Sequence, residues 1–338
     1  MRRKHVVLIA LIAVVLLLAA VAPVAATAVR VGAAYDAPVV EGTFGFIAHQ
    51  GVVAAEGDLP IKVKEVDPWT VRGDFIPPEE QVESLLSRSD LIIGVGFLYT
   101  GAFEMFAPDR PDIDFALIDS FVDLPNVASI AFASNEGSFL MGAAAALTSE
   151  NDTIGFIGGV DIPIIFEFEA GFVAGVHYIN PDAEVLIEYI SEWPDLSGFG
   201  DPGRAYELAM DMYDDGADVV YHAAGFSGFG LFAAADEFSA ANDHVWAIGV
   251  DTDQYLVVGP EQAEHILTSM LKRVDVAAYD MIEAEVDGTF TGGLHWYDLA
   301  ADGVGYATTG GFLDSIIDEL EALKAQIIDG SIVVPSWP

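Results

Sequence analysis

Short apolar segments alternate with longer amphipathic stretches along the chain from Val29 onward. The apolar segments are rich in Val and Ile and are bounded by Gly, Asp, Pro or Asn, a pattern typical of strands buried on both faces of a parallel sheet. Nine strands are predicted, at residues 29–34, 61–66, 91–95, 115–119, 127–132, 154–158, 185–190, 218–222 and 246–250.

The stretches between these strands have the periodicity of helices. Helices are predicted at residues 79–87, 136–149, 167–179, 203–214, 228–241 and 312–328. Because strand and helix alternate, the predicted fold class is α/β with parallel sheets.

Two runs of strands meet near residues 134–135, which indicates two doubly wound lobes instead of one very large sheet. We assign residues 29–133 and about 251–290 to an N-terminal lobe. The C-terminal lobe takes residues 134–250 and about 291–338. In open parallel sheets, ligands bind beyond the carboxyl ends of the strands. Two facing lobes would therefore enclose a shared cleft.

The first 28 residues have the pattern of a secretory signal peptide. Residues 2–4 are basic, residues 6–22 are apolar, and residues 26–28 form an Ala-Thr-Ala cleavage pattern. The apolar stretch is also long enough to span a membrane, so an uncleaved anchor is the alternative. With either outcome the sequence predicts export from the cytoplasm.

Acidic residues greatly outnumber basic residues. The chain has 53 Asp and Glu against 13 Lys and Arg, a formal net charge of −40. Without the three basic residues of the leader, 10 remain against the same 53 acids, which gives −43. The acids are spread along the whole chain, which favours a surface adapted to molar salt over an acidic interaction tail. Nucleic acid is not an expected partner, because its phosphates require Lys and Arg.

The chain offers little for catalysis or metal binding. It has no cysteine, so disulfides, thiolate catalysis and a lipid-modified N-terminal cysteine are excluded. The sequence lacks both a Gly-x-Ser-x-Gly nucleophile elbow and an Asp-x-Asp-x-Asp-Gly metal loop. No cofactor or metal is therefore expected, and His222 is interpreted as a structural residue of a buried strand. Glycosylation of the Asn151-Asp152-Thr153 sequon stays open.

Several short motifs, in this order and spacing, resemble the basic membrane protein (BMP) family of ABC-transporter substrate-binding proteins. The resemblance runs from about residue 30 to about residue 315. The motifs are GVGF at 94–97, FALID at 115–119, GGVDIP at 158–163, FEAGF at 168–172 with Gly175, DGAD at 215–218, HAAG at 222–225, IGVDTDQ at 248–254 and SMLKR at 269–273.

This resemblance implies a type I periplasmic-binding-protein fold, in which two lobes joined by a three-strand hinge close on a ligand. It implies a binding protein that captures a nucleoside, with a purine favoured, and delivers it to ABC permease subunits. We expect a monomer that associates with the membrane through the permease or an uncleaved leader. The alternatives are a membrane-associated sensor of the same ligand and a nucleoside-processing enzyme, although the clustered Asp calcium site of a nucleoside hydrolase is missing.

Two candidate ligand-binding residues belong to the first lobe. Phe44 follows the first predicted strand, in a loop where the family carries an aromatic residue that stacks on the base. Its alternative role is plain core packing. Asp119 ends a predicted strand, where its carboxylate could accept hydrogen bonds from a base or a sugar. The alternative for Asp119 is a helix N-cap.

Two charged candidates lie further along the chain, after residue 250. Asp251 follows the predicted strand 246–250 and corresponds to the sugar contact of the family. An ionised carboxylate is a strong acceptor for ribose hydroxyls. The resemblance places Lys272 near the ligand, with a salt bridge to one of the many carboxylates as the alternative. Asp253 and Gln254 are interpreted as residues that shape the hinge.

Three further candidates are apolar. Phe166 and Phe168 follow the GGVDIP motif, and one of the two rings is expected to cover the second face of the base. Gly225 lies in a predicted strand-to-helix turn, where a missing side chain lets backbone N–H groups approach a ligand. The sequence does not decide which base is bound or whether a sugar is required.

Overall fold

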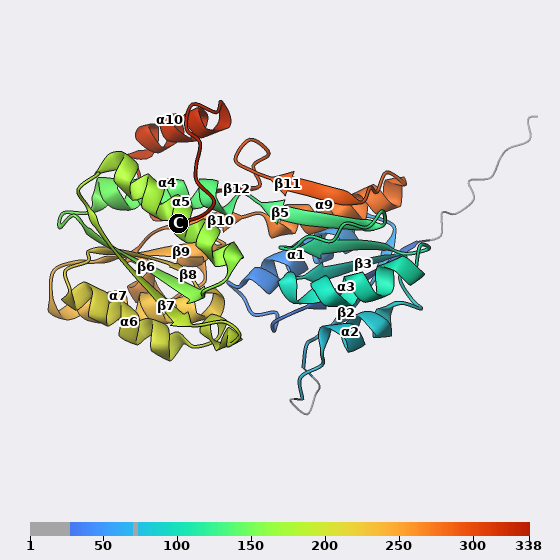
Figure 1. Cartoon of the computed structure of the whole chain (residues 1–338). Helices are drawn as coiled ribbons and strands as arrows, with labels where there is room; N and C mark the ends of the chain where they lie inside the picture. Colours follow the sequence, from blue (N-terminus) through green and yellow to red (C-terminus); the bar gives the residue numbers. More distant parts are fainter. Residues whose placement is uncertain (1–27, 70–73) are drawn as a thin grey trace, which may run out of the picture.

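The computed structural model describes residues 28–69 and 74–338 and has two parallel-dominated sheets with helices on both faces (Figure 1). The α/β class and the periplasmic-binding-protein type of fold predicted from the sequence are confirmed. The predicted signal peptide lies outside the described residues except for Ala28. Within the described part of the chain, no helix is long and apolar enough to cross a membrane.

The first lobe contains a six-stranded, all-parallel sheet in the order β11-β5-β4-β3-β1-β2. Its strands are β1 (Val29–Tyr35), β2 (Ile61–Val66), β3 (Leu91–Val95), β4 (Asp114–Ile118), β5 (Val127–Phe132) and β11 (Gly293–Tyr297). Its helices are α1 (Phe44–Asp58), α2 (Pro78–Leu85), α3 (Thr100–Phe106) and α9 (Val274–Asp287). Helices α1 and α9 pack together in one layer, and α2 and α3 pack together in the other.

Strand β3 shows why these apolar segments form central strands. All five of its residues are buried. Leu91, Ile93 and Val95 join the core cluster beneath α1 and α9, whereas Ile92 joins the cluster beneath α2 and α3. Successive side chains of a strand point to opposite faces, so a strand covered on both sides needs an uninterrupted apolar run.

The second lobe repeats this architecture with the order β12-β10-β9-β8-β6-β7. Its strands are β6 (Thr153–Val160), β7 (Glu184–Ser191), β8 (Val219–Ala223), β9 (Trp246–Asp251), β10 (Ile266–Lys272) and the antiparallel edge strand β12 (Val304–Tyr306). Its helices are α4 (Ser134–Thr148), α5 (Pro163–Ile179), α6 (Pro202–Asp214), α7 (Phe229–Ala241), α8 (Pro260–Ala263) and α10 (Ile317–Ile328).

The spacing of the glycines in α5 has a packing cause. Helices α4 and α5 form the most extensive helix–helix contact of the fold. A Cβ on Gly171 would lie 2.1 Å from the Asn135 carbonyl oxygen, and one on Gly175 would lie 2.0 Å from the Phe139 carbonyl oxygen. Any side chain at these two positions would push the helices apart, so the glycines set their close approach.

The chain passes between the lobes three times, after β5, after β10 and after β11 (Figure 1). The second and third crossings differ from the expected boundaries. Strand β10, expected in the first lobe, pairs with β9 in the second sheet, and β11, expected in the second lobe, pairs with β5 in the first. The reason is that one helix and one strand, α9 and β11, complete the first lobe after β10 has completed the parallel part of the second.

The two sheets have equivalent strand orders, so each strand of one lobe has a counterpart in the other. Strand β1 corresponds to β6, β3 to β8, β4 to β9 and β5 to β10. The residues that follow corresponding strands therefore face each other across the space between the lobes. This relation, which the sequence shows only as a loose resemblance, positions the site described next.

Candidate functional site

A cavity of about 740 Å³ lies between the lobes, at the carboxyl ends of both sheets. This volume is within the range of small-molecule sites, which span roughly 300–1,000 Å³. Most of the surface of the cavity is apolar. Its lining residues are Asp36, Ala37, Pro38, Val40, Thr43, Phe44, Gly45, Trp69, Phe75, Gly96, Phe97, Leu98, Asp119, Ile164, Ile165, Phe168, Leu196, Ser197, Phe199, Gly200, Ala223, Gly225, Phe226, Val250, Asp251 and Lys272.

Two aspartates occupy corresponding positions in the two lobes. Asp119 directly follows β4, and Asp251 is the last residue of β9, the counterpart of β4. Both have left-handed backbone conformations, with φ of 64° for Asp119 and 68° for Asp251. Such values are uncommon for residues other than Gly and occur preferentially at functional sites. The turn that ends each strand thus aims a carboxylate into the cavity.

Lys272 at the end of β10 connects the two lobes electrostatically. Its Nζ atom lies 2.6 Å from Oδ2 of Asp119, and its side chain is almost fully buried. The rings of Phe44, Phe132 and Phe168 lie around the ammonium group, with centroids 5.1, 5.1 and 5.5 Å from Nζ. A buried ammonium needs such compensation, because transfer of a lone charge out of water is costly. The Asp119–Lys272 pair therefore holds the lobes together beside the hinge.

The remaining carboxyl groups of the site are desolvated. Burial, together with the nearby charge of Asp119, raises the pKa of Asp36 to about 7. Burial also raises the pKa of Asp251 to about 6, although Lys272 opposes the increase. Glu167 of α5, close to the same charges, has its pKa raised to about 7 by burial against the opposing effect of Lys272. Near neutral pH the site thus contains carboxyl groups that are poised to gain or lose protons.

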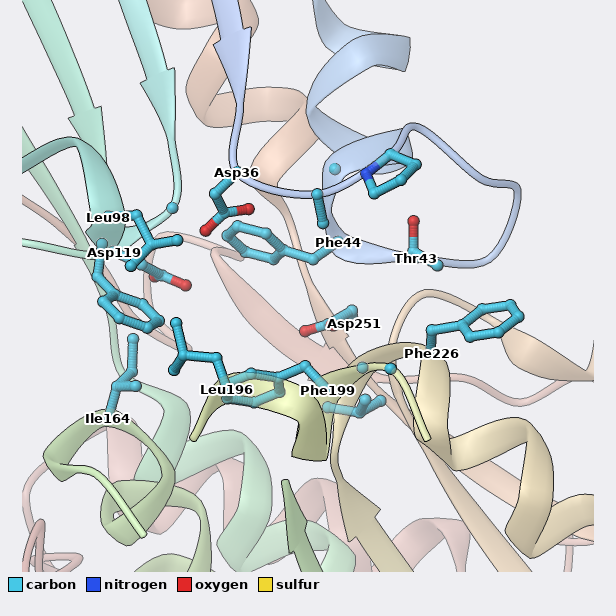
Figure 2. Close-up of a pocket in the computed structure, with 18 of the residues that line it drawn as sticks. Asp36, Thr43, Phe44, Leu98, Asp119, Ile164, Leu196, Phe199, Phe226 and Asp251 are labelled. Atoms are coloured by element: carbon cyan, nitrogen blue, oxygen red, sulfur yellow. The ribbon is translucent and has the colours of Figure 1, made fainter. Parts of the chain in front are cut away.

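Aromatic and aliphatic side chains form the walls of the cavity around these acids. Figure 2 shows the Phe44 ring on the side of the first lobe and the Phe199 ring on the side of the second, with the Asp251 carboxylate in the same space. Phe226 lies at one end of the cavity, and Leu98 and Ile164 lie at the other. A flat ligand would gain contact area on both faces between such walls.

Six of the seven candidate residues from the sequence line this cavity: Phe44, Asp119, Phe168, Gly225, Asp251 and Lys272. Phe166 does not, because its ring packs edge-to-face on Trp337, with centroids 5.0 Å apart, and on Tyr189. Phe168 is 3% exposed and approaches Lys272, so its ring belongs mainly to the base of the site. The ring of Phe199 is therefore better placed than either of them to cover a second ligand face.

Asp36 and Phe199 are two residues of the cavity lining that the sequence interpretation did not include. Asp36 directly follows β1, so the rule that ligands lie beyond strand ends could have identified it. Phe199 lies in a single turn of 3₁₀ helix, Leu196–Phe199, between β7 and α6. Its SGFGDP context has no periodicity, and no signal in the sequence distinguishes this ring from the other phenylalanines.

Gln254 connects the lobes a second time. Its Nε2 atom donates a hydrogen bond of 3.3 Å to the carbonyl oxygen of Gly42, in the loop that precedes α1. Its Oε1 atom accepts from the backbone N–H of Val250 at 2.8 Å and lies 3.0 Å from Nε2 of His222. Burial lowers the pKa of His222 to about 4, so its ring is neutral. The lobes are thus closed against each other in this structure.

Among the described residues, no group of three or more His, Asp, Glu or Cys is arranged to hold a metal ion. The histidine nearest the cavity, His222, is fully buried behind Gln254. The arrangement can bind and enclose a small molecule through aromatic faces and carboxylate acceptors.

Two similar α/β lobes, three connections between them and an interlobe cavity define a fold of the periplasmic-binding-protein type. The chain belongs to the Bmp family, "ABC transporter substrate-binding protein PnrA-like", whose model matches residues 28–337. Members of this family are substrate-binding proteins of ABC transport systems and not enzymes. The BMP resemblance of the sequence motifs is therefore confirmed.

Individual relatives agree with this assignment. The chain is 36% identical over 256 residues to the ABC transporter nucleoside-binding protein BmpA of Lactococcus lactis, covering 73% of this chain and 71% of that protein. It is 34% identical over 270 residues to an uncharacterized lipoprotein of Pyrococcus horikoshii, covering 78% and 65%. Among solved structures, an ABC transporter solute-binding protein from Aeropyrum pernix superposes with a TM-score of 0.77 at 28% identity, covering 91% of this chain and 94% of that chain.

Proposed function

We propose that this protein captures a purine nucleoside in the interlobe cavity and delivers it to the permease of an ABC importer. The observation that carries the proposal is the position of Asp251 in a cavity with the Phe44 and Phe199 rings on its two sides (Figure 2). The nucleoside-binding activity named for the Lactococcus lactis relative supports the same ligand class.

The base would lie between the Phe44 and Phe199 rings. Stacking on an aromatic side chain contributes about 1–3 kcal/mol per base. A purine offers more stacking area than a pyrimidine, and the largely apolar cavity has the volume for it. Asp36 and Asp119, on the same side of the cavity as Phe44, could accept hydrogen bonds from N–H groups at the edge of the base.

The ribose would be recognised by Asp251. A carboxylate can accept hydrogen bonds from two neighbouring hydroxyls, and an acceptor in a desolvated cavity gains from being satisfied. Lys272 would act through Asp119, because its ammonium group is bonded to that carboxylate and surrounded by rings. The pair would keep the Asp119 carboxylate oriented toward the ligand.

We further propose that the protein works outside the cytoplasm. The pattern of residues 1–28 supports export. The Pyrococcus horikoshii relative is named a lipoprotein, but this chain has no cysteine to carry a lipid. Attachment to the membrane would therefore use the permease or an uncleaved leader. Sequencing of the N-terminus of the protein from its native host tests this, because a start near Val29 supports cleavage and an intact Met1 supports an anchor.

Isothermal titration calorimetry in molar salt tests the proposed ligand. The panel consists of purine nucleosides, pyrimidine nucleosides and the corresponding free bases. We expect the tightest binding for a purine nucleoside and at least tenfold weaker binding for the Phe44→Ala variant, which corresponds to about 1.4 kcal/mol. If the wild type binds no purine compound, the proposed cargo is wrong, although the family assignment stands.

A further inference from the structure

The interlobe cavity carries more negative charge than positive charge. Asp36, Asp119 and Asp251 line it, whereas Lys272 is the one Lys or Arg among the described lining residues. Glu167 adds a further carboxyl group close enough for both Asp119 and Lys272 to influence it. With all of these groups ionised, the lining has two surplus negative charges even before Glu167 is counted.

Lys272, the one cation among the described lining residues, is already bonded. Lys272 donates to Asp119 at 2.6 Å, is about 1% exposed and has three aromatic rings around its ammonium group. In the described part of the chain, no Lys or Arg forms an ion pair with Asp36 or Asp251. Figure 2 shows both of these carboxylates directed into the cavity. A ligand therefore meets two carboxyl groups that form no ion pair with a Lys or Arg of the described residues.

We propose that the cavity selects nucleosides by charge, favouring a base that carries a positive charge over a neutral base and rejecting phosphorylated ligands. This inference rests on the proposed function and names the class of nucleoside that the site prefers. A cationic base would neutralise the surplus charge of Asp36 and Asp251. The flanking aromatic faces would add a favourable interaction, because a cation is attracted to the negative face of a ring.

A phosphate group would meet the opposite conditions. Phosphate recognition uses Arg or Lys side chains that are free to donate charge-assisted hydrogen bonds. Here the cation is committed to Asp119, and a dianionic group would approach Asp36 and Asp251 in a poorly hydrated space. Salt screens exposed charges but screens buried pairs much less, so the selection should persist in molar salt.

Calorimetric titrations with matched ligands test the proposal. N1-methyladenosine has a positively charged base at neutral pH, whereas N1-methylinosine has a methyl group at the same position and a neutral base. Adenosine and inosine differ at the same exocyclic position and are both neutral, so this pair corrects for the change of that group. Adenosine monophosphate tests whether a phosphorylated ligand is rejected. N1-methyladenosine should bind more tightly than N1-methylinosine, and this affinity ratio should exceed the ratio of adenosine to inosine at least tenfold. Adenosine monophosphate should bind at least tenfold more weakly than adenosine.

Two variants locate the origin of this preference. Asp36→Asn should reduce the cation preference several-fold, because it removes a carboxylate that lines the cavity. Glu41→Gln is the matched control, since Glu41 lies in the same loop but is exposed and outside the cavity lining, so the preference should not change.

The outcomes separate this inference from the proposed function. Equal ratios for the two ligand pairs, or a monophosphate that binds as tightly as adenosine, would overturn charge selection while leaving nucleoside binding intact. If Glu41→Gln and Asp36→Asn lose the preference for a cationic base equally, the inference is also wrong. The preference would then come from the electrostatic field of the whole protein and not from the cavity. If none of the nucleosides binds, the proposed function fails and the charge selection falls with it.

Discussion

Asp36, Asp119 and Asp251 lie at the ends of β1, β4 and β9 and meet in one cavity, yet they differ in their partners. Asp119 is paired with Lys272, whereas Asp36 and Asp251 have their pKa raised by burial. The paired residue is suited to hold the lobes in position. Asp36 and Asp251 are suited to bind a ligand, because a ligand can supply the hydrogen bonds that water no longer provides.

Replacement of Asp251 tests the ribose contact. Asp251→Ala should weaken the binding of a purine nucleoside roughly 5- to 150-fold, because an unpaired buried sugar hydroxyl costs about 1–3 kcal/mol. The affinity for the free base should change far less. Calorimetry with one nucleoside and its base measures both effects, and an equal loss for the two ligands contradicts the ribose assignment.

Asp36 should make the thermal stability of the ligand-free protein depend on pH. Its pKa is raised to about 7 by burial and by Asp119, with the buried Tyr99 also nearby. A carboxyl group with a raised folded-state pKa stabilises the fold at low pH, and this contribution is lost as pH rises through the folded-state pKa. The melting temperature of Asp36→Asn relative to the wild type should therefore increase between about pH 4 and pH 7 and stay level above that.

The control for this measurement is again Glu41→Gln, whose side chain is exposed. Its melting temperature should follow that of the wild type across the same pH range, apart from a constant offset. A constant difference between Asp36→Asn and the wild type would mean that Asp36 ionises with an ordinary pKa.

At the scale of elements, closure depends on the loop between β1 and α1. Gly42 in this loop is buried, has φ of 84°, and offers its carbonyl oxygen to Gln254 of the other lobe. A Cβ at this position would lie 2.8 Å from Cγ2 of Val257 and 3.1 Å from Cζ of Phe229. Both neighbours belong to the second lobe, so a side chain here opposes the closed arrangement.

Gly42→Ala should therefore weaken ligand binding about tenfold or more while leaving each lobe folded. Gly216→Ala is the matched control, because Gly216 also has a left-handed backbone, with φ of 102°, and open space around its Cβ position. Both variants should lose some stability from backbone strain, but the control should keep its affinity. Comparable losses of affinity in the two variants would argue against a closure role for Gly42.

At the scale of the whole molecule, the acidic surface dominates the electrostatics. Most of the ion pairs in the described part of the chain have an exposed partner, as in Arg30–Asp90 and Arg204–Glu207. Exposed pairs contribute about 0–1 kcal/mol each, which cannot offset the mutual repulsion of so many carboxylates at low ionic strength. We therefore expect the fold to require salt.

The melting temperature should increase strongly from millimolar to molar potassium chloride, because the screening length falls to about 3 Å at 1 M. Circular dichroism or calorimetry at a series of salt concentrations measures the effect. A neutral osmolyte at matched water activity is the control for general stabilisation by exclusion from the surface. A melting temperature independent of salt would contradict the prediction of a salt-adapted surface.

The resemblance of the chain's motifs to the BMP family pointed to Phe44. The sequence by itself determined the alternation of strands and helices, the α/β class, and the positions of Asp119 and Asp251 at the ends of strands. These features depend on local pattern, since a buried parallel strand needs an apolar run and a ligand residue follows the end of such a strand. Tertiary structure decided the rest. Lys272 bonds Asp119, which is 153 positions away, and Trp337 from the chain end covers Phe166. Such partners are set by the packing of two lobes against each other, which no local sequence pattern encodes.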